Sequence, residues 1–290
     1  MNKKYTPANI SLIVTVLCFA AAYPGVMATE DSFSSGPLIV LRSIAAGLTL
    51  YLFVKILKLS IRIPAKDALF AALVGQLGIS SYQWLIYEGQ KVSSAGTAAT
   101  IINTAPIFAF FGAAFLWKEK IPLIKWVGVF IAFFGIYLLG ISGSSQESYG
   151  IIYLLISAVA LGFFSVLIKP LVNKHHPLVI TFYATIPGAI IFSPTIPTLI
   201  KEIPNASLTG WLGVLALSII VSGFGYTANS YAVNYLGVSK TVIVYYLVPP
   251  VAIFYTSILF REFPLPLEYL GVAVVILGVV LARSTRSKRV

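Results

Sequence analysis

The sequence predicts an all-α integral membrane protein whose ten transmembrane helices form two inverted five-helix repeats. Composition gives the first reason: hydrophobic residues are 58% and charged residues 10% of the 290 residues, against roughly 45–50% and about 25% in soluble domains. Apolar segments of about 20 residues, the length that crosses a bilayer, recur along the chain. A series of landmark residues also occurs twice, about half a chain apart, which indicates an internal duplication.

The duplication is carried by a spaced pattern of tyrosine, proline, glutamate and glycine. The tyrosines and the proline lie 144 residues apart in the two copies, and the glutamates and glycines 143 apart, so a single one-residue gap aligns them. The first copy contains Tyr82, Tyr87, Pro106, Glu119, Gly128 and Gly135, and the second contains Tyr226, Tyr231, Pro250, Glu262, Gly271 and Gly278. We therefore expect a first repeat at residues 1–143 and a second at residues 150–290, joined by a polar, serine-rich link around residues 142–149.

We expect five spans in each repeat, and each should be a helix because lipid offers the backbone no hydrogen-bonding partner. Lys3 and Lys4 before the first span would also suit a signal peptide, but the duplication requires a fifth span in the first half. The predicted spans are residues 10–28, 37–54, 68–87, 94–116 and 123–141 in the first repeat, and residues 150–168, 178–196, 208–234, 238–260 and 267–282 in the second.

The charges predict how the chain lies in the membrane. With ten spans and a cytoplasmic N-terminus, 16 of the 20 basic residues fall on the cytoplasmic side, and seven of the nine acidic residues fall outside. The positive-inside rule therefore favours an N-in, C-in topology. Five spans per repeat set the two repeats in opposite senses, which places a substrate site near the midplane between them. The formal charge of +11 is thus an orientation signal, and we expect no nucleic-acid partner.

Several local patterns make the chain resemble the EamA family of the drug/metabolite transporter superfamily. The matching residues are Pro37, Leu38, Leu41 and Arg42 in the second span, Pro106, Lys118 and Glu119 at the fourth, Trp126, Gly128 and Gly135 in the fifth, Pro250 and Glu262 at the ninth, and Tyr269, Gly271 and Gly278 in the tenth. This resemblance covers essentially the whole chain. It implies a multi-pass protein of the bacterial inner membrane that carries small metabolites, often amino acids, through a cavity lined mainly by spans one to four and six to nine.

Polar and aromatic residues inside the spans are the candidates for a substrate cavity. Tyr82, Gln83 and Trp84 lie in the third span, and Tyr226 and Asn229 lie at the corresponding place in the eighth. Two such clusters at opposite depths would suit paired gates around a central site, and an aromatic belt at each interface is the alternative. The remaining candidates are Thr100, Asn103, Tyr245 and Tyr246. For Asn103 the alternative is a hydrogen bond that holds neighbouring helices together.

Prolines interrupt the fourth and ninth spans at corresponding depths. Pro106, Pro249 and Pro250 each remove an amide hydrogen and so free a carbonyl that must find another partner. A static kink would explain one such proline. Because the break is duplicated, we expect hinges or breaks that line the substrate cavity.

Arg42 is the basic residue that the predicted topology leaves inside a span. A charge at that depth should face protein or water and should be paired. We expect Arg42 to pair with Glu88, near the outer surface, and thereby to stabilise the fold. The alternative is that its guanidinium holds the carboxylate of a substrate.

Motifs for other chemistry are missing from the sequence. It contains no GxxxxGK[ST] phosphate-binding loop and no HExxH motif, and its single Cys18 excludes a cysteine-based metal site. We therefore expect no catalytic residues, metal or cofactor, and no enzymatic activity.

We predict a secondary transporter that moves a small organic metabolite, an amino acid or related compound, by alternating access, with efflux favoured. An importer or exchanger of a cofactor or nucleotide-like metabolite is one alternative, and a non-transporting membrane scaffold is another. The expected partners are the substrate, the lipid bilayer and a second copy of the chain. Glycines spaced seven residues apart, as at Gly128 and Gly135, would suit close helix packing within one chain or between two.

Overall fold

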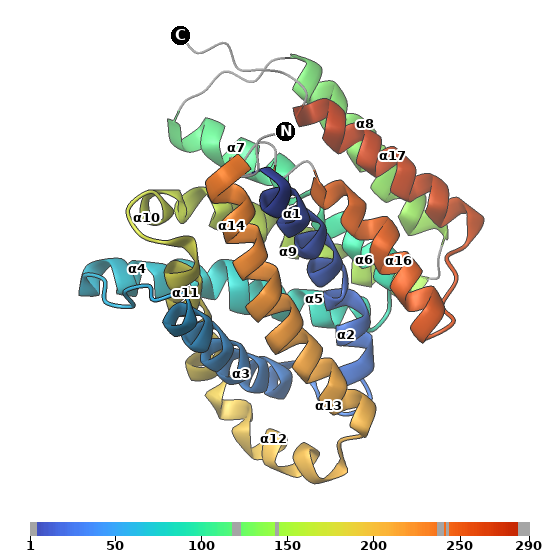
Figure 1. Cartoon of the computed structure of the whole chain (residues 1–290). Coiled ribbons are helices and arrows are strands. Elements are labelled where there is room, and N and C mark those ends of the chain that lie inside the picture. The colour runs from blue at the N-terminus through green and yellow to red at the C-terminus, as the bar shows by residue number, and fades with distance from the viewer. Residues whose placement is uncertain (1–4, 118–122, 143–144, 237–240, 242–243, 284–290) are drawn as a thin grey trace.

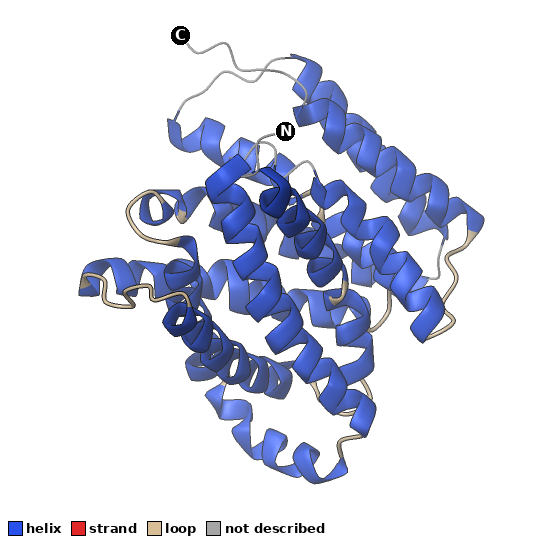
Figure 2. Cartoon of the chain, in the orientation of Figure 1, coloured by secondary structure: helices blue, strands red, loops and turns tan. Residues whose placement is uncertain are grey.

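The protein is all-helical, as the sequence predicts. The structure, a computed structural model, describes residues 5–117, 123–142, 145–236, 241 and 244–283. Every regular element in those ranges is a helix, and they contain no strand (Figure 2). This is the expected outcome for an apolar chain, because a helix satisfies its backbone hydrogen bonds within one segment.

The first half of the chain forms eight α-helices and one π-helical segment. They are α1 (Tyr5–Ala20), α2 (Ala22–Thr29), α3 (Ser35–Ile56), α4 (Ala65–Gly75), η1 (Gln76–Ser81), α5 (Tyr82–Gln90), α6 (Ala95–Ile102), α7 (Ala105–Trp117) and α8 (Leu123–Ser142). The second half contains α9 (Ser145–Leu167), α10 (Lys169–Val172), α11 (Pro177–Ile191), η2 (Ser193–Thr195), α12 (Ile196–Glu202), η3 (Ile203–Asn205), α13 (Leu208–Leu215), η4 (Ala216–Gly225), α14 (Tyr226–Leu236), η5 (Val244–Leu247), α16 (Val248–Leu259) and α17 (Pro266–Arg283).

Among the described residues, five continuous helical stretches are long and apolar enough to cross a membrane. They are Pro7–Thr29, Ser35–Ile56, Ala65–Gln90, Tyr149–Leu167 and Leu208–Val233. The pair Pro177–Ile191 and Ser193–Asn205, bent by 50°, would make a sixth, and Leu123–Leu139, Val244–Leu259 and Pro266–Ala282 are shorter apolar helices. The protein is therefore an integral membrane protein by the length and composition of its helices, while the count of ten spans stays a prediction.

The predicted fourth span is broken where its proline requires a break. Helix α6 ends at Ile102 and α7 begins at Ala105, so two residues stand between the two helices. Pro106 has no N–H to donate to the carbonyl of Ile102, four residues earlier, which explains the position of the break. The Thr104 amide instead donates to the Ile101 carbonyl at 2.9 Å, a tighter turn.

Two π-helical segments precede the duplicated tyrosines. Segment η1 ends at Ser81, directly before Tyr82, and segment η4 ends at Gly225, directly before Tyr226. The two halves thus share a departure from α-helical geometry at the same place in their sequence pattern. Such π-helical turns are uncommon and frequent at functional sites. They were not expected from the sequence.

Helices α8 and α17 pack side by side along their length (Figure 1). Four glycines allow the close approach. A Cβ atom on Gly278 would lie 2.3 Å from the amide nitrogen of Ala132, and one on Gly128 would lie 2.3 Å from that of Ala282. Gly135 and Gly271 face each other's backbones in the same way. The seven-residue glycine spacing is therefore used within one chain, and a homodimer stays a prediction without support from these residues.

Glu262, between α16 and α17, and Glu268, in the first turn of α17, hold the first turn of α6. Glu262 accepts a hydrogen bond from the Ala95 amide. One oxygen of Glu268 lies 3.4 Å from the hydroxyls of Ser94 and Thr97. Carboxylates are favourable at this end of a helix because its free N–H groups carry partial positive charge. Burial and the charge of Glu268 nevertheless raise the pKa of Glu262 above its ordinary value.

Replacing Gly278 with alanine should destabilise the α8–α17 pair. The new methyl group would overlap the Ala132 backbone, and overpacking of this kind costs about 1–3 kcal/mol. Gly47→Ala is the matched control, because nothing lies within 4 Å of a Cβ at Gly47 in α3. Thermal unfolding in detergent should show a lower midpoint for Gly278→Ala only. Equal midpoints for the two variants would contradict the packing described.

The raised pKa of Glu262 makes a prediction about pH. A carboxyl group whose pKa is higher in the folded state destabilises the fold once it ionises, so stability falls as pH rises through that pKa. Glu262→Gln removes this ionisation. The stability of the wild type relative to Glu262→Gln should therefore decrease as the pH rises above about 4.5, the ordinary pKa of a glutamate. A difference in melting temperature that stays constant as the pH rises would show that the Glu262 carboxylate is not disfavoured.

Candidate functional site

A cavity of about 650 Å³ lies among helices from both halves of the chain. This volume falls inside the range of roughly 300–1,000 Å³ that is usual for small-molecule sites. Most of its wall is apolar. The polar and aromatic side chains in the wall are Phe19, Tyr23, Arg42, Tyr82, Gln83, Tyr87, Asn103, Lys125, Ser165, Tyr226, Asn229 and Tyr245.

The structure brings most of the residues predicted for the cavity into this wall, and leaves others out. Those in the wall are Arg42, Tyr82, Gln83, Asn103, Tyr226, Asn229 and Tyr245, together with the predicted hinge residue Pro106. Those outside it are Trp84, Thr100, Tyr246, Pro249 and Pro250.

The excluded residues contact other parts of the protein. The Trp84 ring packs edge-on against Tyr153 of α9, with the ring centroids 6.2 Å apart. The hydroxyl of Thr100 donates to the Gly96 carbonyl in its own helix at 2.7 Å. Tyr246 and Pro249 are buried elsewhere, and Pro250 is exposed. In each case helical rotation, which the sequence pattern did not resolve, turns the side chain away from the cavity.

Five polar or aromatic side chains of the wall were missed: Phe19, Tyr23, Tyr87, Lys125 and Ser165. Tyr87 carried a signal, because it is one of the residues repeated in the second half at Tyr231. Phe19 and Tyr23 belong to the first span, where an even apolar composition hides which face is turned inward. Lys125 begins a helix, and its position gave no hint of a cavity.

An aromatic cluster from three helical segments forms one side of the cavity. The Phe19 ring of α1 lies with its centroid 5.4 Å from that of Tyr226 and 5.7 Å from that of Tyr245. The Tyr245 hydroxyl donates to the side-chain oxygen of Asn229, one turn along α14 from Tyr226. Edge-to-face contacts of this kind stabilise ring pairs by about 0.5–1.5 kcal/mol beyond their burial. The cluster therefore fixes hydroxyl and amide groups on a rigid aromatic surface.

The opposite part of the wall comes from the break in the predicted fourth span and from the start of α5. Asn103 stands between α6 and α7, and its side-chain nitrogen donates to the Ala99 carbonyl at 2.7 Å. That bond uses one donor and leaves the amide oxygen for other partners. The backbone at Tyr82 is held by the Ser157 hydroxyl of α9, which donates to the Tyr82 carbonyl at 2.9 Å. The side chain of Asn103 and the backbone of Tyr82 are thus held in place beside the cavity.

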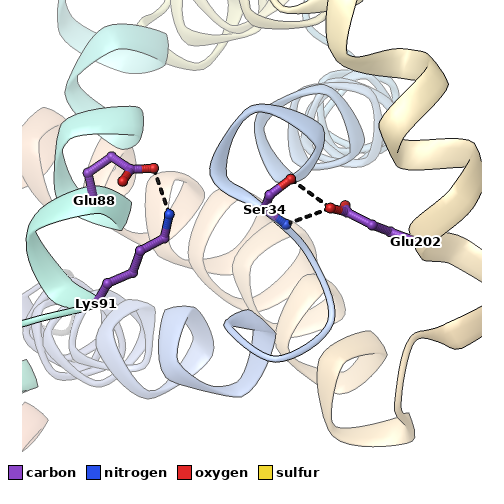
Figure 3. Close-up of polar contacts among 4 residues, drawn as sticks. All are labelled: Ser34, Glu88, Lys91 and Glu202. Carbon is purple, nitrogen blue, oxygen red and sulfur yellow. Dashed lines mark hydrogen bonds and ion pairs between the residues drawn. The ribbon is translucent and has the colours of Figure 1, made fainter.

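Arg42 lies in this wall, and its partner differs from the predicted one. The side chain is buried, and its Nη1 donates to the Tyr87 hydroxyl at 2.7 Å. Its Nε atom has no hydrogen-bonding partner. Glu88 instead pairs with Lys91 one turn later, at 2.7 Å (Figure 3). The predicted Arg42–Glu88 pair is therefore wrong, because Glu88 lies at the end of α5 where solvent-exposed Lys91 can reach it.

The charge of the wall is positive. Arg42 and Lys125 are its cations, and none of the wall residues is an aspartate or glutamate. The described residues also contain no group of three or more His, Cys, Asp or Glu side chains that would hold a metal ion. The chemistry available is thus hydrogen bonding, aromatic contact and the attraction of a negative group.

The cavity extends toward one end of the helix bundle. Lys125 near the start of α8, Ala282 near the end of α17 and Ser165 near the end of α9 all contribute to the wall. At the other end of the bundle, where α12 and α13 lie (Figure 1), side chains join the two halves. Ser34, before α3, donates to Glu202 of α12 through its hydroxyl at 2.6 Å and its amide at 3.2 Å (Figure 3). The Ser32 and Ser207 hydroxyls lie 3.0 Å apart.

Comparison with known proteins relates the whole chain to membrane transporters. A "Probable terminal-alkyne amino-acid exporter" from Streptantibioticus cattleyicolor is 29% identical over 99% of this chain and 97% of its own length. An uncharacterized transporter of Bacillus subtilis is 28% identical over 96% of this chain and 92% of its own. A solved crystal structure aligns with a TM-score of 0.63 at 16% identity, covering 95% of this chain and 96% of that one, and this likeness concerns the fold alone.

The model of the EamA-like transporter family matches twice, at residues 6–141 and at residues 148–284. The two matches together cover nearly the whole sequence, and each corresponds to one of the halves that the landmark residues define. The resemblance noted in the sequence is thereby confirmed. The chain belongs to the EamA-like transporter family.

Proposed function

We propose that this protein is a secondary carrier that moves a small organic metabolite across the bacterial inner membrane by alternating access. The observation that carries the proposal is the cavity of about 650 Å³ between the two halves. Its wall contains Tyr82 and Tyr226, which correspond to each other in the two repeats, and Pro106 at the break between α6 and α7. Inverted repeats with a substrate site at their interface are a recurring design of such carriers. The twin family matches and the matching π-helical segments support a two-repeat architecture.

The proposed topology has ten spans with both termini in the cytoplasm. Under it, Lys125, Ser165 and Ala282 lie toward the cytoplasmic side, so the cavity of this structure opens inward. The hydrogen bonds between Ser34 and Glu202 then close the outer side. Alternating access would require these outer contacts to break while the inner ends of the helices come together.

An amino acid or related compound is the proposed substrate, and efflux is the proposed direction. The aromatic and neutral polar wall suits an amphipathic molecule of that size. The name of the Streptantibioticus relative, an amino-acid exporter, supports the same class. A cofactor or nucleotide-like substrate has less support, because a polyanion needs more cations than the two in the wall. A scaffold without transport would leave the duplicated breaks and the cavity without a use.

Exchange of labelled amino acids in proteoliposomes tests the proposal directly. The purified protein should exchange at least one member of a panel with saturable kinetics. Tyr82→Ala combined with Tyr226→Ala should weaken that exchange by about tenfold or more, because truncating buried tyrosines at a binding site removes more than about 1.4 kcal/mol.

Trp84→Ala is the matched control, since Trp84 neighbours Tyr82 in sequence but packs on Tyr153 outside the cavity. It should exchange at close to the wild-type rate. Saturable exchange that is equally lost in Trp84→Ala, or equally retained in the double variant, would contradict a site at the two tyrosines. No exchange of any panel member would argue against the amino-acid reading.

The break at Pro106 gives a separate prediction. Pro106→Ala restores an N–H that can bond to the Ile102 carbonyl and join α6 to α7, so we expect a slower exchange without loss of folding. Pro250→Ala is the control, because Pro250 is exposed and outside the cavity wall. Exchange rates and melting temperatures of both variants decide the point. An unchanged rate in Pro106→Ala would mean that the break is a static feature.

A further inference from the structure

We propose that Arg42 binds the carboxylate of the transported substrate, and that the cavity selects carboxylate-bearing molecules without net positive charge. The inference rests on the proposed transport function and adds the chemical class of the substrate to it. It follows from an imbalance of charge in the wall, where a buried guanidinium meets hydroxyl groups but no acid.

A buried guanidinium without a negative partner is costly. Arg42 is only 6% exposed, and its Nη1 donates a hydrogen bond to the neutral hydroxyl of Tyr87. Charged side chains in the interior of membrane proteins are expensive and as a rule are paired or mark a substrate path. The hydroxyl of Tyr87 bonds to Arg42, and Tyr82 and Tyr226 lie in the same cavity wall. They soften the cost without supplying the missing negative charge.

Four acids of the described residues have their carboxylates engaged away from this cavity. Glu88 pairs with Lys91, and the carboxylate of Asp67 lies 2.7 Å from Nε2 of His175. Glu202 accepts from Ser34, and Glu268 accepts from the Leu265 amide at 3.0 Å. None of them is part of the wall. Because no acid of the described residues lies in the wall beside Arg42, the negative group assigned to it here is that of a bound molecule.

The contact with Tyr87 prepares the guanidinium for such a molecule. Tyr87 takes Nη1 and so fixes the plane of the group, while Nε stays without a partner. A guanidinium binds a carboxylate through two parallel N–H groups on one edge, a paired charged contact that an uncharged ligand of the same size does not make. The edge that carries Nε is the one that Tyr87 does not use.

The rest of the wall determines which ligands the cavity excludes. A ligand with an ammonium group finds no carboxylate there, only neutral oxygens such as that of Asn103 and the faces of aromatic rings. A zwitterion can therefore bind because its carboxylate meets Arg42, and a monoanion can bind as well. A cationic amine lacks the carboxylate and is repelled by both Arg42 and Lys125. Amino acids and N-acylated amino acids fit this rule, and amino-acid amides do not.

Equilibrium binding to the purified protein tests the proposal with ligands that differ at one group. The probes are L-leucine and L-phenylalanine, their N-acetyl derivatives and their amides. We expect the acids to bind about 10- to 100-fold more tightly than the amides, the usual effect of a hydrogen bond to a charged partner. Arg42→Gln should abolish this ratio, and Arg42→Lys should keep part of it. Arg62→Gln, which removes an exposed arginine, should leave it unchanged.

The melting temperature without ligand separates a binding role from a structural one. Arg42→Gln removes an uncompensated buried charge, so the ligand-free variant should melt at or above the wild-type temperature. If it fails to fold, Tyr87→Phe and Arg42→Lys carry the test, and Tyr87→Phe should retain the preference for acids. Amides that bind as tightly as acids, or an acid preference that survives in Arg42→Gln, would overturn the proposal.

The failure of this inference is distinguishable from that of the transport function. Exchange of panel compounds in proteoliposomes together with an acid-to-amide ratio of about one would leave the carrier standing and remove Arg42 as its anchor. Absence of binding by all four acids would overturn the inference as well. Absence of exchange by the whole panel would instead remove the function on which it rests.

Discussion

The structure depends on one constraint: a polar group inside an apolar bundle must find its partner within the protein. Most buried polar groups meet it with a local carbonyl. The Thr100 hydroxyl and the Asn103 amide each bond back into their own helix, and Gln90 of α5 reaches the Tyr23 carbonyl of α2 at 2.7 Å. The same constraint places the helix break at Pro106, where an amide hydrogen is missing. In the cavity wall, Nε of Arg42 is left without a partner, and a ligand bound there would supply one.

The close packing of the helices leaves the cavity as the space between them. Glycines let α8 and α17 touch along their backbones, and the same kind of contact brings Gly213 of α13 against the Gly25 carbonyl of α2. Around Phe19, Tyr226 and Tyr245, large aromatic side chains pack against one another and form part of the cavity wall. Hydrogen bonds at one end of the bundle, such as Ser34 with Glu202, join the halves there. The result is a cavity that extends toward the opposite end.

The sequence was sufficient for the all-helical class and the family, because these depend on apolar length and on a duplicated pattern. Tyr82, Asn103 and Tyr226, which it singled out as candidates, lie in one cavity wall, and their role in binding stays a prediction. It failed where the outcome depends on helix rotation: Trp84 follows Tyr82 by two residues and points to α9 instead. Two π-helical segments change the helix rotation just before Tyr82 and Tyr226, and no residue pattern in the sequence predicts these segments. The predicted pairing of Arg42 with Glu88 was also wrong. The positions of the two residues in the sequence do not determine which side chain the guanidinium faces, and it faces Tyr87.

We propose that the cavity between the halves is a transport site that is reached from one side of the membrane at a time. Cysteine accessibility tests it most directly, since Cys18 is the single cysteine of the chain and Cys18→Ala gives a background for labelling. In that background Ser165→Cys, in the cavity wall, should react with a membrane-impermeant thiol reagent in inside-out vesicles and be protected when an exchanged amino acid is present. It should react far more slowly in right-side-out cells. Labelling that is equal from both sides, or that no transported compound alters, would contradict the account.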